Sequence, residues 1–371
     1  MQDHGDAGPP GSRPVGPLPP HVEALDAAIF AAHHAVDPAR LLNPLNVAEA
    51  QAAFFAGAPE PPFRYAASSE LAEWQARLAA HSAGDDHPFS GLLRSAVASF
   101  DRMANALRHR DAEHFDLWAR HERWEDGVVP DAAPAGAPSA PEPAMGAPLM
   151  RQALEAGLAA RGLVGWQVSW DPVMSARVLV ESSRREIRVN PAAQFRESDV
   201  RRLVAHEIDV HVSRSENGKR QPLRLFSTGL PGSLHTEEGL AMCAEEHVGA
   251  LGPNTAERQR RIGAIVRLAR SMGFRELWEH IKPEYGPRGA FSVILRLKRG
   301  LSDPGRPGVY AKDAVYGLGW GAVRRWLANG GELAHLYVGK VGIHHPVGDW
   351  LREGLVLPAP VPALWNTAGL Y

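Results

Sequence analysis

The sequence contains a single cysteine, Cys243, among its 371 residues. One thiol cannot form an internal disulfide, so a disulfide-stapled extracellular scaffold is excluded and a reducing cytoplasm is the expected location. Long apolar runs are missing too: no stretch approaches the ~20 residues of a membrane-spanning helix, and the N-terminus has no apolar signal-peptide core. We therefore expect a cytoplasmic protein with no membrane partner.

An excess of charge of either sign is also absent. Lys and Arg together number 40 and Asp and Glu 42, which gives a net charge of -2. Without a basic field or stripe, a nucleic-acid partner is not expected. The hydrophobic content of 44% is typical of a globular protein with a buried core.

Composition divides the chain into segments. Residues 1–20 are rich in Pro and Gly and are expected to form a disordered tail, whereas 126–148, rich in Pro, Ala and Gly, read as a linker or long surface loop. Between them, residues 21–125 are predicted to be mainly helical. Apolar residues recur there at helical spacing in three stretches, the second preceded by Ser69 as a possible N-cap: Val22, Leu25, Ile29 and Phe30; Leu71, Trp74 and Leu78; Leu93, Ala96, Val97, Phe100, Ala104 and Leu107.

The spacing of the apolar residues along the chain changes in residues 149–371. WQVSW (166–170) and the segments RVLVES and REIRVN, joined around Ser183, favour strands. Helices are expected to begin near Ser198, Thr236 and Thr255, and another to run from about Asp313 to the stop at 329–330. The predicted fold class is α+β, mainly helical with a small β-sheet.

The most informative motif is His206-Glu207-x-x-x-His211. In the zinc-protease pattern H-E-x-x-H, two imidazoles one turn apart face the same ion, with the Glu beside the open position. Here the spacing is one residue longer, so on a regular α-helix the two rings would stand about 140° apart. The motif therefore predicts that the helix is π-bulged or ends between the two histidines.

A third ligand is expected in Thr236-Glu237-Glu238-Gly239, where a carboxylate sits in the first turn of a helix and Gly239 would allow the metal-bearing helix to approach closely. Two imidazoles and Glu238 would bind one Zn²⁺ and leave the fourth position open, as in catalytic sites. Glu245 is a candidate to accept a ligand N–H, or else a solvated face residue. Glu237 is interpreted as a carboxylate that the helix dipole favours.

The segments HEIDVH, ENGKRQPLRLFSTGL and TEEGLA resemble the zinc tyrosine-carboxypeptidase family, whose members include the microtubule-associated tyrosine carboxypeptidases and bacterial QEGLA-motif, flavohemoglobin expression-modulating proteins. In that last motif this chain has Glu237 where many relatives have Gln before the Glu. The resemblance implies a zincin-like metallopeptidase core in residues 149–371, with His206, His211 and Glu238 as zinc ligands and Glu207 as general base. Eukaryotic members remove a C-terminal tyrosine from tubulin, so the implied partner is a peptide or protein C-terminus.

Such a mechanism also needs a donor for the oxyanion and a cation for the substrate's terminal carboxylate. Candidates in segments that match the family are Tyr310 and Tyr316 for the first role, and Arg299, Lys312 and Arg214 for the second. Two further residues are expected to shape a loop over the cleft, or equally to be turn residues: Asn217 and Gln221. The alternative is a non-enzymatic regulatory protein that keeps a structural zinc site.

Overall fold

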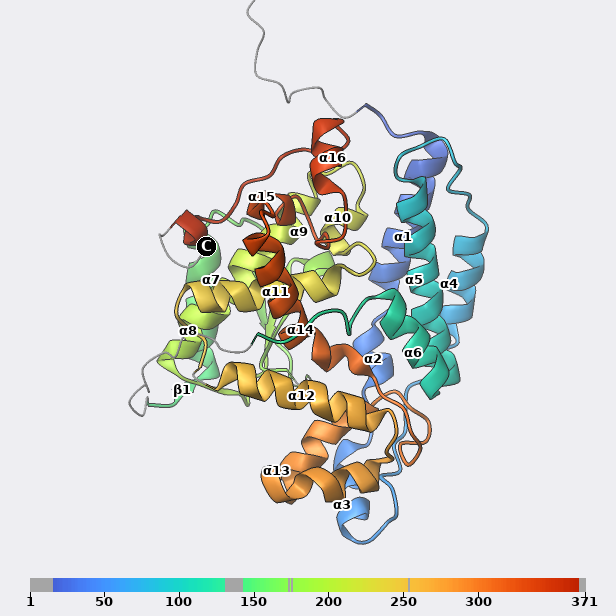
Figure 1. Ribbon diagram of the computed structural model, residues 1–371, viewed down its shortest axis with the longest axis vertical. Helices are drawn as coiled ribbons and strands as arrows, with labels where there is room; N and C mark the ends of the chain where they lie inside the picture. The colour runs from blue at the N-terminus through green and yellow to red at the C-terminus, as the bar shows by residue number, and fades with distance from the viewer. Residues whose placement is uncertain (1–15, 131–142, 173, 175, 253, 367–371) are drawn as a thin grey trace, which may run out of the picture.

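The computed structural model describes residues 16–130, 143–172, 174, 176–252 and 254–366. The N-terminal helices are blue to teal in Figure 1. They are α1 (Pro20–Ala35), α2 (Pro38–Leu42), α3 (Val47–Phe55), α4 (Glu70–Ala79), α5 (Ser90–His109) and α6 (Ala112–His121). Helices α1, α4, α5 and α6 stand together along one side of the molecule, and α2 and α3 lie below α1. The three predicted apolar stripes lie on α1, α4 and α5 and are largely buried.

Capping differs from the sequence-based expectation. Ser69 stands at the N-cap position of α4, but its side chain makes no capping hydrogen bond. Two helices that the pattern did not predict are capped by aspartates, α2 by Asp37 and α6 by Asp111. Each carboxylate accepts a backbone N–H three residues on, which satisfies one of the free donors of the first turn.

The small sheet has the strand order β2-β4-β3, with β4 in the middle. Strand β2 (Gln167–Trp170) runs parallel to β4 (Glu186–Val189), and β3 (Val178–Glu181) runs antiparallel to it. The predicted turn around Ser183 is the short 3₁₀ helix η1 (Ser182–Arg184). A second ladder pairs β1 (Met145–Gly146) with β5 (Gln194–Phe195). Strands and helices thus confirm the predicted α+β fold, mainly helical with little sheet.

Helices α7 (Ala147–Ala160) and α8 (Glu197–Leu203) share one apolar cluster with the sheet, and η2 (Val204–Val212) follows α8 directly. The remaining elements are α9 (Ser213–Gly218), α10 (Leu225–Thr228), α11 (Ser233–His247), α12 (Thr255–Ala269), α13 (Phe274–Lys298), η3 (Ala311–Ala314), α14 (Val315–Ala328), α15 (Leu333–Leu336), α16 (Val347–Arg352) and η4 (Ala363–Asn366). No helix among the described residues is both long enough and apolar enough to cross a membrane.

Two predicted helix starts are shifted. Helix α8 begins before Ser198, and the Asp199 carboxylate accepts the backbone N–H of Arg196 at its entrance. Helix α11 begins three residues before Thr236, whose hydroxyl instead accepts the backbone N–H of Ile343. In the sequence, a threonine that hydrogen-bonds a distant loop looks the same as a threonine that caps a helix. The local pattern therefore could not distinguish these two roles.

The main hydrophobic core joins the N-terminal helices to the second half of the chain. Phe54 on α3 packs against Phe274 and Phe291 of α13, with ring centroids 5.2 and 5.6 Å apart. The helical region 21–125 therefore shares its core with the rest of the protein. The predicted tail and linker fall mostly outside the described residues, and the division at 20, 125 and 148 stays a prediction.

Helices α11 and α14 cross in direct backbone contact. A Cβ on Gly239 would lie 2.3 Å from the Gly319 carbonyl carbon, and a Cβ on Gly319 would lie 2.0 Å from the His235 carbonyl oxygen. Both positions therefore exclude any side chain. Gly239 does allow a close approach, as the sequence suggested, but its partner is α14 rather than the helix that carries the two histidines.

Candidate functional site

The two motif histidines lie on η2, which is a π-helix rather than an α-helix. In a π-helix the backbone bonds join residues five apart, so residues at that spacing stack one turn above each other. The rings of His206 and His211 consequently lie on one face, with centroids 4.9 Å apart. The predicted bulge is confirmed.

Contacts from α7 and α9 hold this unusual helix in place. Gly157 on α7 leaves room for it, because a Cβ there would come within 2.8 Å of the Ile208 side chain. Arg161 forms a two-pronged ion pair with the buried Asp209, at 2.5 and 2.7 Å. At the end of η2 the Ser213 hydroxyl donates to the Ile208 carbonyl, five residues back. The wide turn is thus packed and hydrogen-bonded on the side away from the histidines.

Glu238 on α11 faces both imidazoles. Its Oε2 lies 3.5 Å from His206 Nε2 and 3.6 Å from His211 Nε2, and this oxygen is buried with no hydrogen-bond partner among the described residues. Ligands of a tetrahedral zinc at 2.0–2.1 Å stand about 3.3 Å from each other. Three inward-facing donor atoms at this spacing, one of them otherwise unsatisfied, fit a metal ion.

The other nitrogen of each imidazole is held by a carboxylate of α11. His206 Nδ1 donates to Glu245 at 2.8 Å, and His211 Nδ1 donates to Glu237 at 2.7 Å. These bonds fix the tautomer that leaves both Nε2 atoms free to bind a metal. The hydrogen bond expected of Glu245 is present. For Glu237 the dipole interpretation was wrong, because its carboxylate holds His211 and is buried.

Each of these supporting carboxylates is itself paired with a cation. Glu245 accepts from Arg202 at 3.2 Å, and Glu237 lies 2.8 Å from the Lys340 Nζ. Burial raises the pKa of Glu237, but Lys340 and then His211 outweigh it and hold that pKa well below its ordinary value. Glu237 is therefore ionised, and it can only accept the His211 hydrogen bond.

The three candidate ligands strongly perturb one another's pKa. Burial disfavours the charged form of His206, but the surrounding carboxylates, Glu207 above all, raise its pKa well above the ordinary value. Burial acts in the same direction on His211, whose pKa is raised by its bonds to Glu237 and Glu238. Burial raises the pKa of Glu238, but the two imidazoles hold it well below the usual range. The cluster thus favours a cation at its centre.

The candidate ligands open into a cavity of about 260 Å³. Glu207, Lys312 and Tyr316 line it, as does Lys340, which sequence reasoning missed because the segment around it carries no motif. Edge strand β3 forms one wall, and the other lining residues come from α10, α11 and the turn before β3: Ala176, Thr228, Ser233 and Leu234. Lys312 makes no ion pair within the described part of the chain, whereas Lys340 is bound to Glu237.

Three predicted site residues do not line this cavity. Arg214 is fully buried and donates to the carbonyls of Leu336 and Gly339, so it anchors the segment that carries Lys340. The Arg299 guanidinium lies 5.1 Å from the centre of the Tyr310 ring. Tyr310 itself is buried among aromatic side chains: Phe115, Trp118 and Trp124. These three residues lie in segments that resemble the family, but they do not line the cavity.

Asn217 and Gln221 also lie outside the cavity. The Asn217 amide donates to the carbonyls of Tyr337 and Pro360, at 2.8 and 3.0 Å. Gln221 exchanges two hydrogen bonds with the Leu357 backbone. Both residues fasten the C-terminal segment and neither lines the cavity, so their role in shaping a loop over the cleft stays a prediction.

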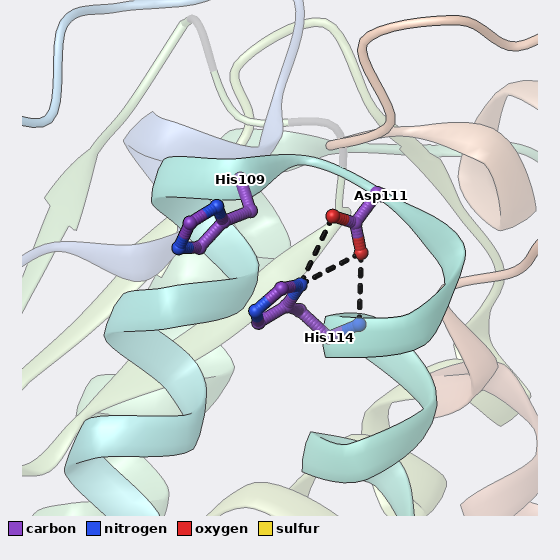
Figure 2. Close-up of side chains that lie close together, drawn as sticks. All are labelled: His109, Asp111 and His114. Atoms are coloured by element: carbon purple, nitrogen blue, oxygen red, sulfur yellow. Dashed lines mark hydrogen bonds and ion pairs between the residues drawn. The ribbon is translucent and has the colours of Figure 1, made fainter.

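A second histidine and carboxylate group lies at the corner between α5 and α6 (Figure 2). His109 and His114 stack nearly parallel there, with ring centroids 4.1 Å apart and planes inclined by 10°. Both oxygens of Asp111 contact His114 Nδ1, at 2.8 and 3.0 Å. Unlike the first group, this one is largely exposed.

Comparison with known proteins agrees with this geometry. A family model described as microtubule-associated tyrosine carboxypeptidase matches residues 131–366, well over half of the chain. The match includes η2, α11, Lys312, Tyr316 and Lys340, whereas helices α1 to α6 precede it.

Three mammalian relatives share this similarity, each called microtubule-associated tyrosine carboxypeptidase 1. The Mus musculus protein is 30% identical over 155 residues, 40% of this chain and 32% of its own length. Those of Rattus norvegicus and Homo sapiens are both 29% identical over 160 residues, 42% of this chain and 34% and 33% of theirs. The alignments thus span about a third of the length of these relatives.

Proposed function

Because the chain belongs to the microtubule-associated tyrosine carboxypeptidase family, we propose that it is a zinc-dependent carboxypeptidase that removes an aromatic residue from a peptide or protein C-terminus. One observation carries the proposal: the His206, His211 and Glu238 donor atoms open into a cavity that Glu207 also lines. A structural zinc site is closed by four protein ligands, and a catalytic one keeps a position open. This favours an enzyme over a regulator with a structural zinc.

When bound in such a site, Zn²⁺ lowers the pKa of a water molecule to about 7 and polarises the carbonyl that is attacked. Glu207 follows His206 directly and reaches the same cavity. In our proposal its carboxylate takes the proton of the attacking water and returns it to the departing amine. A cytoplasmic location remains the prediction from the single cysteine.

Tyr316 is the proposed donor to the oxyanion that forms in the transition state. It lines the cavity, and its hydroxyl has no hydrogen-bond partner within the described residues. The negative charge of Glu238, followed by burial, raises the pKa of Tyr316 well above 10. The raised pKa favours the protonated phenol, which is the form that can donate to an oxyanion.

Lys312 is the proposed binding residue for the terminal carboxylate of the substrate. It reaches the cavity from η3 without an ion pair to any described residue, so a substrate carboxylate would be its partner. Lys340 is less suited, because Glu237 already neutralises it. A cation at this place gives an exopeptidase its preference for a free chain end.

Replacement of Glu207 by glutamine tests the proposal. The amide keeps the size of the side chain but cannot accept a proton, so hydrolysis of peptides with an aromatic C-terminus should fall roughly 10²–10⁴-fold. Zinc content, measured by elemental analysis, should not change. Wild-type protein should cleave the free-acid peptide and leave its C-terminal amide nearly intact.

Glu216→Gln is the matched control, because Glu216 lies outside the cavity and pairs with Lys219. It should hydrolyse the peptide at the wild-type rate. Undiminished hydrolysis by Glu207→Gln, or loss of its zinc, would contradict the assigned role. A wild-type protein that binds zinc and cleaves no peptide would favour the regulator instead.

A further inference from the structure

A second cavity, of about 560 Å³, lies between the start of α5, the end of α6 and the segment around the start of α16. It shares no lining residue with the cavity that the candidate metal ligands open into, which we call the metal-site cavity. Its volume lies within the range of small-molecule sites, which is about 300–1,000 Å³. The second cavity is therefore large enough for an organic ligand, at a place separate from the proposed chemistry.

The titratable side chains that line the second cavity are all basic. Arg120 lies in the last turn of α6 and Arg123 just beyond it. The others are three histidines: His121, His344 and His345. No aspartate or glutamate is among the described residues that line it. The lining thus offers guanidinium groups, which bind carboxylate and phosphate oxygens in pairs.

Both arginines are paired with aspartates near the surface. Arg120 lies 2.6 Å from Asp116 and Arg123 lies 2.7 Å from Asp126, and the two arginine side chains are 74% and 49% exposed. Exposed ion pairs contribute little to stability, and a guanidinium has five N–H donors, so both side chains keep donors for a ligand. Arg123 also has a left-handed backbone conformation (φ 58°), a strained state that is frequent at binding sites.

Helix α5 adds a partial positive charge at the same place. It begins at Ser90, between the lining residues Pro88 and Leu92, and it has no acidic residue in its first turn. The N-terminal end of a helix favours a nearby anion, because its first N–H groups carry partial positive charge. The helix end therefore adds to the attraction of the two arginines for an anion.

The rest of the lining includes flat apolar groups. Trp350 of α16 forms part of it and is largely buried. Three prolines complete this part: Pro88, Pro231 and Pro346. An aromatic ring can pack against the face or edge of an indole. The lining therefore suits a ligand that has a flat ring at one end and an anionic group at the other.

We propose that the second cavity binds a small aromatic carboxylate, with the ring against Trp350 and the carboxylate on Arg120 and Arg123. The volume admits a ring with its substituents, and the arginines supply the paired donors that a carboxylate accepts. This inference goes beyond the proposed peptidase function and does not depend on it.

Binding of three small probes to the full chain tests the proposal without any need for hydrolysis. Benzoate has both the ring and the charge, benzamide has the ring without the charge, and acetate has the charge without the ring. The indole ¹⁵N–H resonance of Trp350, assigned from the spectrum of Trp350→Phe, should shift most with benzoate. The dissociation constant of benzoate should be roughly 10-fold lower than that of either other probe. An equal response to benzamide, or no response to benzoate, would overturn the proposal.

Replacement of the arginines tests which groups bind the carboxylate. Arg120→Gln and Arg123→Gln should each weaken benzoate binding roughly 10-fold and leave benzamide binding unchanged, because only the anionic group loses a partner. Arg94→Gln is the matched control, because Arg94 forms the same kind of exposed pair with Asp85 on α5 and does not line the cavity. Equal benzoate binding by all three variants would contradict the assignment of the arginines.

A variant of the metal-site cavity separates this proposal from the proposed function. Lys312→Met removes a cation that lines the metal-site cavity, and the response of Trp350 to benzoate should remain at the wild-type level. Loss of the response in Lys312→Met would place the carboxylate in the metal-site cavity and overturn the proposal. A response that Lys312→Met keeps and Arg123→Gln loses would uphold the second cavity, even in a protein that cleaves no peptide.

Discussion

Two groups of two histidines and one carboxylate lie close together among the described residues, and they differ in how their donor atoms are oriented for a metal ion. In the buried group, both Nδ1 atoms are occupied by carboxylates and both Nε2 atoms point at Glu238. In the exposed group, the carboxylate of Asp111 bonds a ring nitrogen itself. The two groups have the same kinds of ligand at similar distances, so they differ in the contacts that orient those ligands.

The stacked rings of His109 and His114 also show that the exposed group is not oriented for a metal ion. A metal binds an imidazole in the plane of the ring, and two nearly parallel rings one above the other cannot both direct a lone pair at one ion. Figure 2 shows His109 and His114 in this arrangement beside Asp111. His206 and His211 are inclined by 70° and converge. Preorganisation therefore separates a metal site from a chance cluster.

The largest effect is expected from removing the third candidate ligand. Glu238→Ala leaves two imidazoles, and zinc affinity should fall by more than the ~100-fold that a lost supporting residue costs. Competition with a chromophoric chelator measures this. Because the corner cluster is not preorganised, His109→Ala should keep the wild-type affinity and one zinc per chain. Tight binding by Glu238→Ala, or weaker binding by His109→Ala, would reverse our assignment of the two groups.

Sequence reasoning reached the candidate ligands because local spacing encodes them. The H-E-x-x-x-H spacing predicted a helix that is π-bulged or ends between the histidines, because a regular helix does not aim both rings at one ion, and the structure has the π-helix. Lys340 and the cavity wall of β3 were missed because they come from distant segments that only the fold brings together. Arg299 and Tyr310 do not line the cavity, because similarity to a family does not say which face of an element a side chain occupies.

A smaller effect is expected from weakening an orienting carboxylate. Glu245→Gln keeps the shape of the side chain but removes the charge that holds the Nδ1 proton of His206, so zinc affinity should fall about 10–100-fold. Asp111→Asn makes the same change at the corner cluster and should leave zinc affinity unaltered. Chelator competition on both variants is the measurement. Equal affinities in the two variants would show that orientation is not what distinguishes the clusters.

Helices and strands could be predicted where the apolar residues recur with a strong period. They could not be predicted where contacts between distant segments set the bounds of an element. The apolar stripes of α1 and α5 and the strand pair around Ser183 are local signals, and the structure has them. The start of α11 was misplaced because Thr236 bonds a loop more than a hundred residues away. Helix α3 carries too short a stripe to be recognised, and it is held by its aromatic contacts with α13.

The smallest effect is expected from removing the N-cap that Asp111 provides for α6. Its carboxylate accepts the His114 backbone N–H at 2.9 Å as the N-cap of α6, so Asp111→Ala should lower the free energy of unfolding by about 1 kcal/mol at neutral pH without touching zinc affinity. Burial raises the pKa of Asp111, but the hydrogen bonds from the backbone and side chain of His114 together outweigh it and lower that pKa. A carboxyl group whose pKa is lower in the folded protein stabilises the fold at pH values above its pKa in the unfolded chain, about 3.9. This contribution to the free energy of unfolding is lost as the pH falls through the pKa in the folded protein.

The gap between wild type and Asp111→Ala in urea unfolding should therefore shrink between pH 5 and pH 3. Asp111→Asn, which caps as well as aspartate, should keep most of the stability but lose the dependence on pH. If the corner cluster instead held a metal ion as its function, zinc would stabilise the wild type more than it stabilises Asp111→Asn, which keeps only the buried site. Because the carboxylate is already used by the helix end and by His114, we expect zinc to raise the stability of both proteins equally, through the buried site alone.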